Sequence, residues 1–447
     1  MTASSQLEAA CRFACESAHR PMPAYVRDAA LRALVDWFAV SLAALCDPGP
    51  LIVRQQVQHW GTHGQALTLF GDVGAAGPVA MVNGTLSHSL DFDDMHFGTA
   101  VHATGPIMAA ALGVGMDRGC PESSVLAAFV AGYEVATALG GDGAGTRLAA
   151  AGWHPTGVLC HFGAAVAAAS LLELTPPQTA HALGLAATQA GGMQLSGGSM
   201  AKPFHVGKAA MNGVLAAELA ALGMEASTDV LDHPQRGVLG VLFQQPTLPR
   251  LDDLGRVWQI GDNTFKPYAA CQLTHAPHEA AQSLASGFRS DGLNEVRVRV
   301  NPLALKVAGV RQPTTTMEGK FSIGYCVALG LTGRVAGVDA FQPACIADPA
   351  LQRLASLVTV DTCDSIPRCA AQISLTYSDG LVRRADLPAV RGSPERPLNW
   401  NDLEGKFLSC VQPVLGGAAT SLLHVLRSFD QPGRLAQLRE ILATRQR

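Results

Sequence analysis

The sequence carries little charge. Only 15% of its 447 residues are Asp, Glu, Lys or Arg, and the formal net charge is −4. There is no run of Lys and Arg of the kind that follows a phosphate backbone, so no positive field attracts nucleic acid. We therefore expect no nucleic-acid partner.

Long apolar runs are absent too. The longest, residues 106–116 and 163–172, are about half the roughly 20 residues that a membrane span requires. Glu8, Arg12 and Glu16 interrupt the N-terminal segment, which fits an amphipathic helix better than a signal peptide. We expect a soluble protein without a membrane partner.

Paired cysteines and phosphate loops are also missing. The eleven cysteines are an odd number and include no Cys-x-x-Cys pair, which argues against a disulfide framework or a thiolate zinc site. Reduced thiols fit a cytoplasmic protein. The glycine pairs at 191–192 and 197–198 follow no strand and lack the Lys-Ser/Thr pair of a phosphate loop. Nucleotide binding is therefore not expected.

What is present is helical periodicity over most of the chain. From residue 7 to about 260, apolar residues recur three and four positions apart, as in Leu31, Leu34, Val35 and Phe38. Many of these segments are rich in Ala and Gly, which lets helix axes approach closely. The pattern predicts a compact domain of many helices.

The period changes after Asn294. Valines alternate with polar residues over 296–301, as in a strand with one solvated face. Further on, segments 372–377 and 381–385 flank the pair Asp379-Gly380, a strong hairpin signal. A smaller α+β domain is therefore expected in this part of the chain.

The chain is longer than one core usually supports, so two domains are expected. The predicted fold class is mainly α, with a large all-helical domain and a smaller α+β domain. We place the helical domain at residues 1–264 and 394–447 and the α+β domain at 265–393. The Gly- and Pro-containing stretch 392–397 leads back to the helical pattern.

Acid-base groups are concentrated in residues 87–102. This stretch holds three carboxylates and three imidazoles: Asp91, Asp93, Asp94, His88, His96 and His102. A cluster of this kind, in a chain with so little charge, indicates proton-transfer chemistry. Structural alternatives stay open, because the aspartates also suit helix caps or buried ion pairs and the histidines suit plain hydrogen-bonded positions.

Four further segments combine polar groups with glycine, proline or helix starts. They are residues 152–157, 200–208, 265–271 and 321–326. Lysine is scarce in this chain, and three lysines, Lys202, Lys208 and Lys266, fall in these segments, so an anionic ligand is expected. His154 precedes Pro155 where an Ala-rich helix begins, and a helix N-terminus attracts a carboxylate.

This combination suits removal of a proton α to a carboxylate. Histidine supplies a base near neutrality, and lysines stabilise the negative charge that develops. An adjacent carboxylate such as Asp91 is a candidate to orient the histidine. A metal site is the alternative, since the same imidazoles and carboxylates are ligand types. The spacing lacks a His-Glu-x-x-His motif, so we predict neither a metal nor a cofactor.

Together these segments resemble the MmgE/PrpD family, which includes 2-methylcitrate dehydratase, cis-aconitate decarboxylase and iminodisuccinate epimerase. The resemblance spans nearly the whole chain. It rests on His-Ser-Leu-Asp-Phe-Asp-Asp with the downstream His102, Gly-Trp-His-Pro-Thr, Ala-Lys-Pro-Phe-His-Val-Gly-Lys, Phe-Lys-Pro-Tyr-Ala-Ala-Cys, Phe-Ser-Ile-Gly-Tyr-Cys-Val-Ala and a late Gly-Lys-Phe.

The resemblance implies a helical domain made from both chain ends, a smaller α+β lid, a homodimer and a metal-free site between the domains. By motif, the implied site residues are Asp91, His102, His154, Lys202 and Lys266, with Tyr325 from the lid. His102 then resembles the proton-transfer residue and His154 a second donor or base. Lys202 and Lys266 resemble clamps for carboxylates.

Two positions depart from the family pattern. Asp94-Met95 stands where many members have Asp-Asp-Thr, which removes a hydroxyl from the substrate contact, and we count both residues as substrate-binding. Gly324 replaces the usual proline before Tyr325, which leaves that loop less fixed. Both departures change the expected identity of the substrate more than the expected type of reaction.

The implied function is a metal-independent lyase that eliminates water from a small di- or tricarboxylate, as 2-methylcitrate dehydratase does. Two alternatives are an epimerase of an iminodisuccinate-like dicarboxylate, with His102 and His154 as its two bases, and a cis-aconitate-type decarboxylase. A non-catalytic helical binding protein is a further alternative. A binding protein would have no turnover for a substitution of His102 to abolish.

Overall fold

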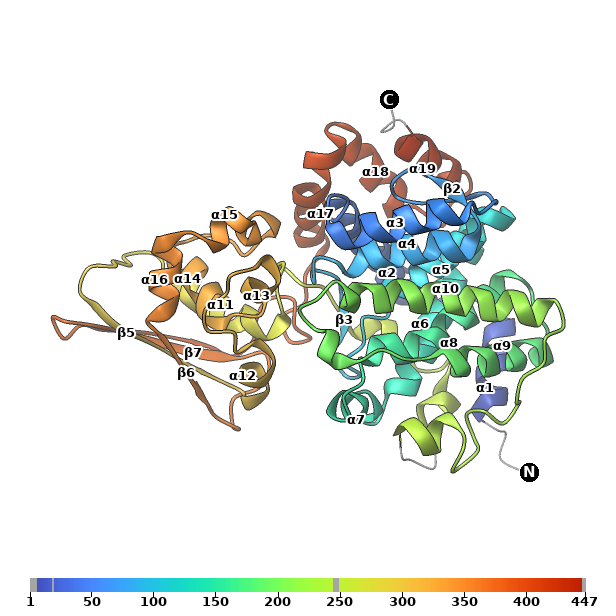
Figure 1. The fold of residues 1–447 in the computed structure, drawn as a ribbon, viewed down its shortest axis with the longest axis horizontal. Helices are drawn as coiled ribbons and strands as arrows, with labels where there is room; N and C mark the ends of the chain where they lie inside the picture. Colours follow the sequence, from blue (N-terminus) through green and yellow to red (C-terminus); the bar gives the residue numbers. More distant parts are fainter. Residues whose placement is uncertain (1–5, 18–19, 244–248, 444–447) are drawn as a thin grey trace. The chain divides into compact units, whose positions relative to one another are not determined.

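The computed structural model describes residues 6–17, 20–243 and 249–443, which are mainly α-helical (Figure 1). The chain divides into two compact units, each described here by itself. The first unit comprises residues 1–89, 93–263 and 400–447, and the second comprises residues 90–92 and 264–399. The first is built from helices and the second combines helices with a sheet, so the predicted fold class is confirmed.

The first unit draws its helices from both ends of the chain. They are α1 (Gln6–Glu16), α2 (Ala24–Ala43), α3 (Pro48–Trp60), α4 (Ala76–His88), α5 (Thr104–Arg118), α6 (Glu122–Gly140), α7 (Ala144–Ala150), α8 (Pro155–Leu171), α9 (Pro176–Gln189), α10 (Ala201–Ala221), α17 (Trp400–Leu415), α18 (Ala418–Arg427) and α19 (Arg434–Ala443). Short helical turns are η1 (Gln194–Ser196), η2 (Leu239–Phe243), η3 (Pro249–Asp253) and η4 (Gln259–Asp262). Its strands are very short: β1 (Ala66–Leu67), β2 (Val73–Gly74) and β3 (Met95–His96). The short strand β4 (Asn263–Thr264) spans the point where its middle segment ends and the second unit begins.

Helix α8 is at the core of this unit. Every residue from Pro155 to Leu171 is buried, as expected for a helix that is apolar on all sides. It packs against α6 and α10. A Cβ on Gly132 of α6 would lie 2.3 Å from the carbonyl oxygen of Gly163 in α8, so this close approach requires glycine. The small residues predicted to bring helices together do so here.

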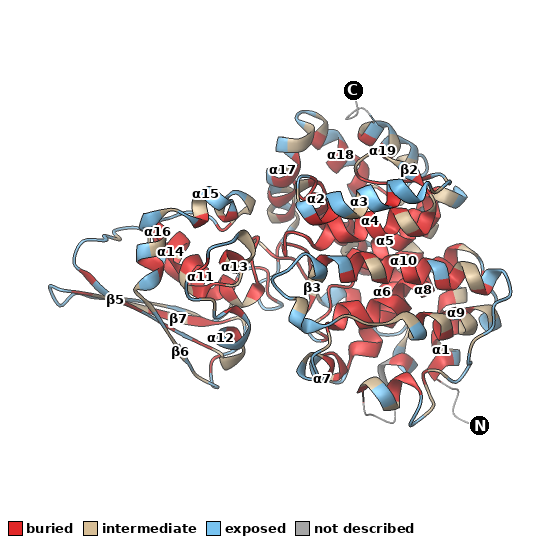
Figure 2. Ribbon diagram, viewed as in Figure 1, coloured by how far each residue is buried: buried red, intermediate tan, exposed pale blue. Residues whose placement is uncertain are grey.

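Helix α6 is long and apolar enough to cross a membrane, and α2 and α3 taken as one bent pair also pass that test of length and composition. However, 83% of the apolar window of α6 is buried inside the protein. Figure 2 shows the same burial along the inner helices of the unit. The apolar character of α6 is therefore explained by its place in the core.

The C-terminal helices belong to the first unit because α17 packs on α2. At this contact Lys406 Nζ donates to Asp36 Oδ1 over 2.6 Å, and both side chains are buried. Trp400 Nε1 of α17 donates to Asp28 Oδ1 of α2. The two ends of the chain are thus joined by a buried ion pair as well as by apolar contacts.

The second unit contains a four-stranded sheet in the order β6-β5-β7-β8. The strands are β5 (Leu293–Val300), β6 (Val358–Thr362), β7 (Ala371–Tyr377) and β8 (Val382–Leu387); β5 pairs parallel with β6, and the other pairs are antiparallel. The helices are α11 (Gln272–Ser283), α12 (Pro302–Ala308), α13 (Thr316–Lys320), α14 (Ile323–Leu331), α15 (Pro343–Ile346) and α16 (Pro349–Ser356), with the turn η5 (Val338–Phe341). Helices α11 and α14 pack on each other, and both contact the sheet.

The strand predictions are confirmed. In β5 the valines at 296, 298 and 300 are buried and the arginines between them are exposed. The hairpin follows β7 as expected: Gly380 has φ +83°, and Tyr377 N–H donates to the Leu381 carbonyl. Asp379 accepts from the Leu381 N–H and so closes the turn.

Candidate active site

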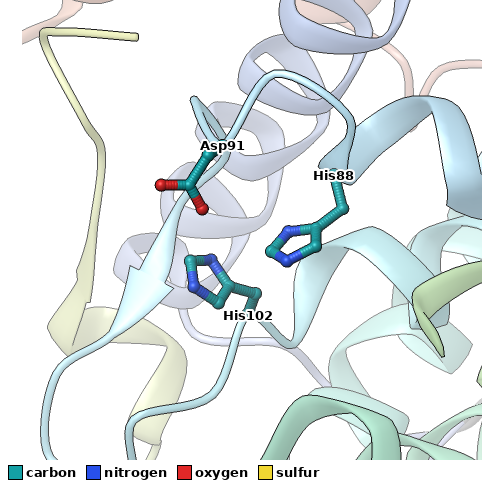
Figure 3. Close-up of side chains that lie close together, drawn as sticks. All are labelled: His88, Asp91 and His102. Carbon is teal, nitrogen blue, oxygen red and sulfur yellow. The ribbon is translucent and has the colours of Figure 1, made fainter. Parts of the chain in front are cut away.

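The first unit contains a pair of imidazoles that share one carboxylate. Helix α4 ends at His88, and His102 lies just before α5. His88 Nδ1 lies 2.7 Å and His102 Nδ1 3.2 Å from the same oxygen, Asp93 Oδ2. The ring centroids are 4.7 Å apart. Figure 3 shows the two rings beside each other, with Asp91 labelled on the loop between them.

The hydrogen bonds fix which nitrogen of His102 carries the proton. Its Nδ1 also lies 2.7 Å from the backbone carbonyl of Asp94, and a carbonyl can only accept. The hydrogen is therefore on Nδ1, and Nε2 is left with a bare lone pair in the neutral ring. The backbone N–H of His102 donates to Thr156 Oγ1, which ties this residue to α8.

His154 and His205 extend the row of imidazoles. His154 occupies the N-cap position of α8, without a capping hydrogen bond from its side chain, and Pro155 lies in the first turn, which confirms the predicted helix start. Its ring stacks on His88 with centroids 5.8 Å apart, and its Nδ1 lies 3.2 Å from His205 Nδ1 on α10. Four imidazoles thus follow one another in the interior of the first unit.

The pKa values of His88, His154 and His205 are all lowered, which favours the neutral form of these three rings near pH 7. Burial lowers the pKa of His88 to about 4, with Lys202 adding to the effect and Asp93 opposing it. Burial, the neighbouring His88 and Lys202 hold the pKa of His154 well below its usual value. Burial and the lysines at 208 and 202 also lower the pKa of His205. The cluster therefore combines neutral rings with nearby cations, an environment suited to an anionic ligand.

Two adjacent aspartates have opposite properties. Burial alone would raise the pKa of Asp93, but the imidazoles of His102 and His88 hold it well below its usual value. Burial, with a contribution from Asp36, raises the pKa of Asp94 to about 8. The Asp94 carboxyl accepts from Thr104 and Asn263. Asp93 is thus the anion that faces the imidazoles, whereas Asp94 is surrounded by neutral donors.

Asp91 and Lys266 meet in the second unit. Lys266 Nζ donates to the Asp91 carbonyl over 2.7 Å and lies 3.4 Å from its carboxylate. Lys320 Nζ donates to the adjacent carbonyl of Leu90 over 2.6 Å. Asp91 has φ +51°, in the left-handed region. The Asp91 carboxylate is thus paired with Lys266, and its predicted role in orienting a histidine stays a prediction. Asp93 is a further carboxylate in this segment, and its Oδ2 lies beside the Nδ1 atoms of His88 and His102.

The remaining predicted site residues lie as follows. Met95 is in β3 and partly exposed, and its role in substrate binding stays a prediction. Tyr325 is in α14, where its hydroxyl donates to the Ala340 carbonyl over 2.7 Å. Its predicted contribution to catalysis also stays a prediction. Lys202 lies in the first turn of α10 and acts electrostatically on three of the imidazoles.

Imidazoles and carboxylates can also hold a transition metal, and His88 and His102 belong to such a group of ligand-type side chains (Figure 3). In the described part of the chain, both Nδ1 atoms already face hydrogen-bond acceptors. A metal would therefore have to bind through the Nε2 atoms. The absence of a metal stays a prediction, which a chelator can test.

Three residues are absent from the set of site residues that the family resemblance implies. His88 and Asp93 belong to the acid-base cluster predicted from composition, and their spacing of five is a usable signal, since it brings the end of a helix and the following loop together. Lys320 ends a short helix after Glu318-Gly319 and carried no signal beyond the scarcity of lysine.

Comparison with known proteins identifies the family of this chain. The model of the MmgE/PrpD N-terminal domain matches residues 8–250, and that of the C-terminal domain matches residues 268–430. The cis-aconitate decarboxylase of Homo sapiens is 27% identical over 366 residues, which cover 78% of this chain and 76% of the relative. A cis-aconitate decarboxylase-like protein, oryM, of Aspergillus oryzae is 26% identical over 438 residues, or 91% and 90% of the two chains.

A third relative, the cis-aconitate decarboxylase of Aspergillus terreus, is 30% identical over 280 residues, which are 57% of each chain. The similarity to enzymes supports an enzymatic role for this chain. The two family models together cover both units almost completely. This protein belongs to the MmgE/PrpD family.

Proposed function

We propose that the protein is a lyase that removes carbon dioxide from a small tricarboxylate of the cis-aconitate type. The observation that carries the proposal is the pair of buried imidazoles on Asp93, next to the charge of Lys202. The relatives named cis-aconitate decarboxylase support the choice of reaction. A polyanionic substrate suits a site in which lysine is the neighbouring charge.

In this reaction the bond between a carboxylate carbon and the carbon skeleton breaks. Carbon dioxide leaves, its bonding electron pair stays on the skeleton, and a proton adds to the skeleton to give a dicarboxylate. Each turnover therefore consumes one proton. His102 is the proposed donor, because its Nδ1 is fixed by the Asp94 carbonyl and Asp93 and only Nε2 remains to exchange a proton. Lys202 holds a substrate carboxylate.

Dehydration of a 2-methylcitrate-like acid is the second candidate. The neutral state of His88 and His154 favours it, since elimination of water begins with removal of a C–H proton by a base. In that reaction one imidazole accepts the proton from carbon, and a protonated group supplies a proton to the departing hydroxyl. The same site geometry thus serves either lyase reaction, and the substrate decides between them.

Proton NMR in D2O with cis-aconitate, 2-methylcitrate, citrate and iminodisuccinate tests both candidates. A new vinyl product from cis-aconitate with release of carbon dioxide supports decarboxylation. An unsaturated product from 2-methylcitrate without carbon dioxide, seen as a methyl doublet that becomes an allylic singlet or as a vinyl signal, supports dehydration instead. Deuterium exchange into iminodisuccinate without a new skeleton would indicate an epimerase, and no change in any of the four acids would contradict a lyase of this substrate class.

A further inference from the structure

His88 has a nitrogen that nothing in the described structure uses. Its side chain is fully buried, and its Nδ1 donates to Asp93 over 2.7 Å. Because Asp93 faces two imidazoles and remains ionised, the hydrogen of His88 must be on Nδ1. Its Nε2 therefore has a bare lone pair, is buried and has no hydrogen-bond partner among the described residues.

An unpartnered buried nitrogen is not by itself a site. His161, His275 and His278 each have one as well. His88 differs in its surroundings: its ring lies 4.7 Å from His102 and 5.8 Å from His154, and it shares a carboxylate oxygen with His102. His161, by contrast, pairs with Asn212. Only His88 among these four lies within the row of imidazoles described above.

The charges around His88 explain what an anion would change there. Among the groups that act on its ring are Asp93, Lys202, His102 and His154. Asp93 favours a positive charge on the ring, whereas Lys202 and burial disfavour it. A bound polyanion would offset Lys202 and add negative charge beside Nε2. Protonation of that nitrogen then becomes favourable.

We propose that His88 is a further catalytic residue, whose bare Nε2 takes up a proton when an anionic substrate binds beside His102. Asp93 is the positioning residue for both rings. The inference rests on the proposed function and extends it, because decarboxylation consumes one proton per turnover and the imidazole pair supplies it. That proton forms the new C–H bond as the C–C bond breaks and carbon dioxide leaves.

The test is proton uptake on ligand binding. Calorimetric titration of the whole protein with tricarballylate and with citrate, in two buffers of different ionisation enthalpy at pH 7, measures the protons bound per ligand. The wild type should take up about one proton per bound tricarballylate. His88→Asn retains an amide that can donate to Asp93 but has no counterpart of Nε2, so uptake should fall close to zero and kcat by about 100-fold or more.

His278→Asn is the matched control. His278 is another buried histidine whose Nε2 has no hydrogen-bond partner among the described residues, but its Nδ1 bonds to the Cys326 carbonyl in the second unit, so uptake and kcat should remain those of the wild type. Thermal melting of both variants checks that they fold. Asp93→Asn removes the negative charge beside both imidazoles, so the pKa that defines the acid limb of the pH–rate profile should move downward. Loss of packing alone would not produce this change.

Nitrogen NMR of the histidines provides an independent measurement if His88→Asn does not fold. The free wild type should show His88 protonated on Nδ1 alone, and tricarballylate should shift the Nε2 signal to that of a protonated nitrogen. Hydrogen on Nε2 in the free protein, no uptake in the wild type, undiminished uptake in His88→Asn, or failure of both acids to bind would each overturn the inference. Uptake without turnover of any acid would contradict the proposed function alone. Turnover that His88→Asn leaves intact would contradict this inference alone.

Discussion

The buried polar groups of the two units are suited to different roles. In the first, Asp93 faces imidazoles, which can donate from one nitrogen and accept at the other. In the second, the ammonium groups of Lys266 and Lys320 donate to the consecutive carbonyls of Asp91 and Leu90. An ammonium has no lone pair to offer. The first arrangement is suited to exchanging protons, whereas the second is suited to fixing a piece of backbone.

The largest effect expected from this comparison is loss of activity at His102. His102→Asn keeps a donor near the Asp94 carbonyl but removes Nε2, so kcat should fall by about 100- to 10,000-fold. Steady-state kinetics with whichever acid the NMR experiment identifies measures the effect. A variant with more than a tenth of the wild-type kcat and an unchanged melting temperature would show that proton exchange is not the task of this unit.

In the second unit the expected effect is on stability instead. Lys320→Met leaves the buried Leu90 carbonyl without this donor, which should cost about 1–3 kcal/mol in the free energy of unfolding. Denaturant titration measures it. Lys306→Met, at an exposed lysine of α12, is the control and should change stability by less than about 0.5 kcal/mol. If Lys320→Met were as stable as the control, the backbone contact would be incidental.

The pH dependence of stability sharpens the comparison further. The pKa of His88 is about 4 in the folded protein and near 6.5 as its ordinary value. Between these values the unfolded state binds more protons, so His88 makes stability rise with pH and decline as pH falls from 6.5 to 4. His88→Asn should reduce that slope by up to about 1.4 kcal/mol per pH unit. Unfolding titrations at several pH values between 4.5 and 7 would detect the change, and an unaltered slope would contradict a neutral His88.

The smallest effect is expected from metal removal. Dialysis against a chelator should leave kcat and the melting temperature unchanged, because hydrogen bonds already account for the Nδ1 atoms of His88 and His102. Loss of activity that added zinc or manganese restores would instead mean that the Nε2 atoms hold a metal.

Much of the fold could be predicted from the sequence because local patterns determine it. The alternating valines of β5, the Asp379-Gly380 turn and the start of α8 after His154 all follow from neighbouring residues. The contacts of the acidic segment do not follow from neighbouring residues. Asp91 and Asp93 are only two positions apart, but Asp91 has a left-handed backbone and contacts Lys266, which lies 175 positions further along the chain. These two features separate the roles of the two aspartates.

Residues 90–92 belong to the second unit although they lie within the sequence of the first. The consequence concerns how this protein can be divided. A fragment of residues 264–399 would contain the whole sheet but would bury the ammonium groups of Lys266 and Lys320 without the two carbonyls that accept from them. We therefore expect that residues 264–399 cannot be produced alone as an intact unit, and that gene fusions or truncations near residue 264 will fail unless residues 90–92 are supplied as well.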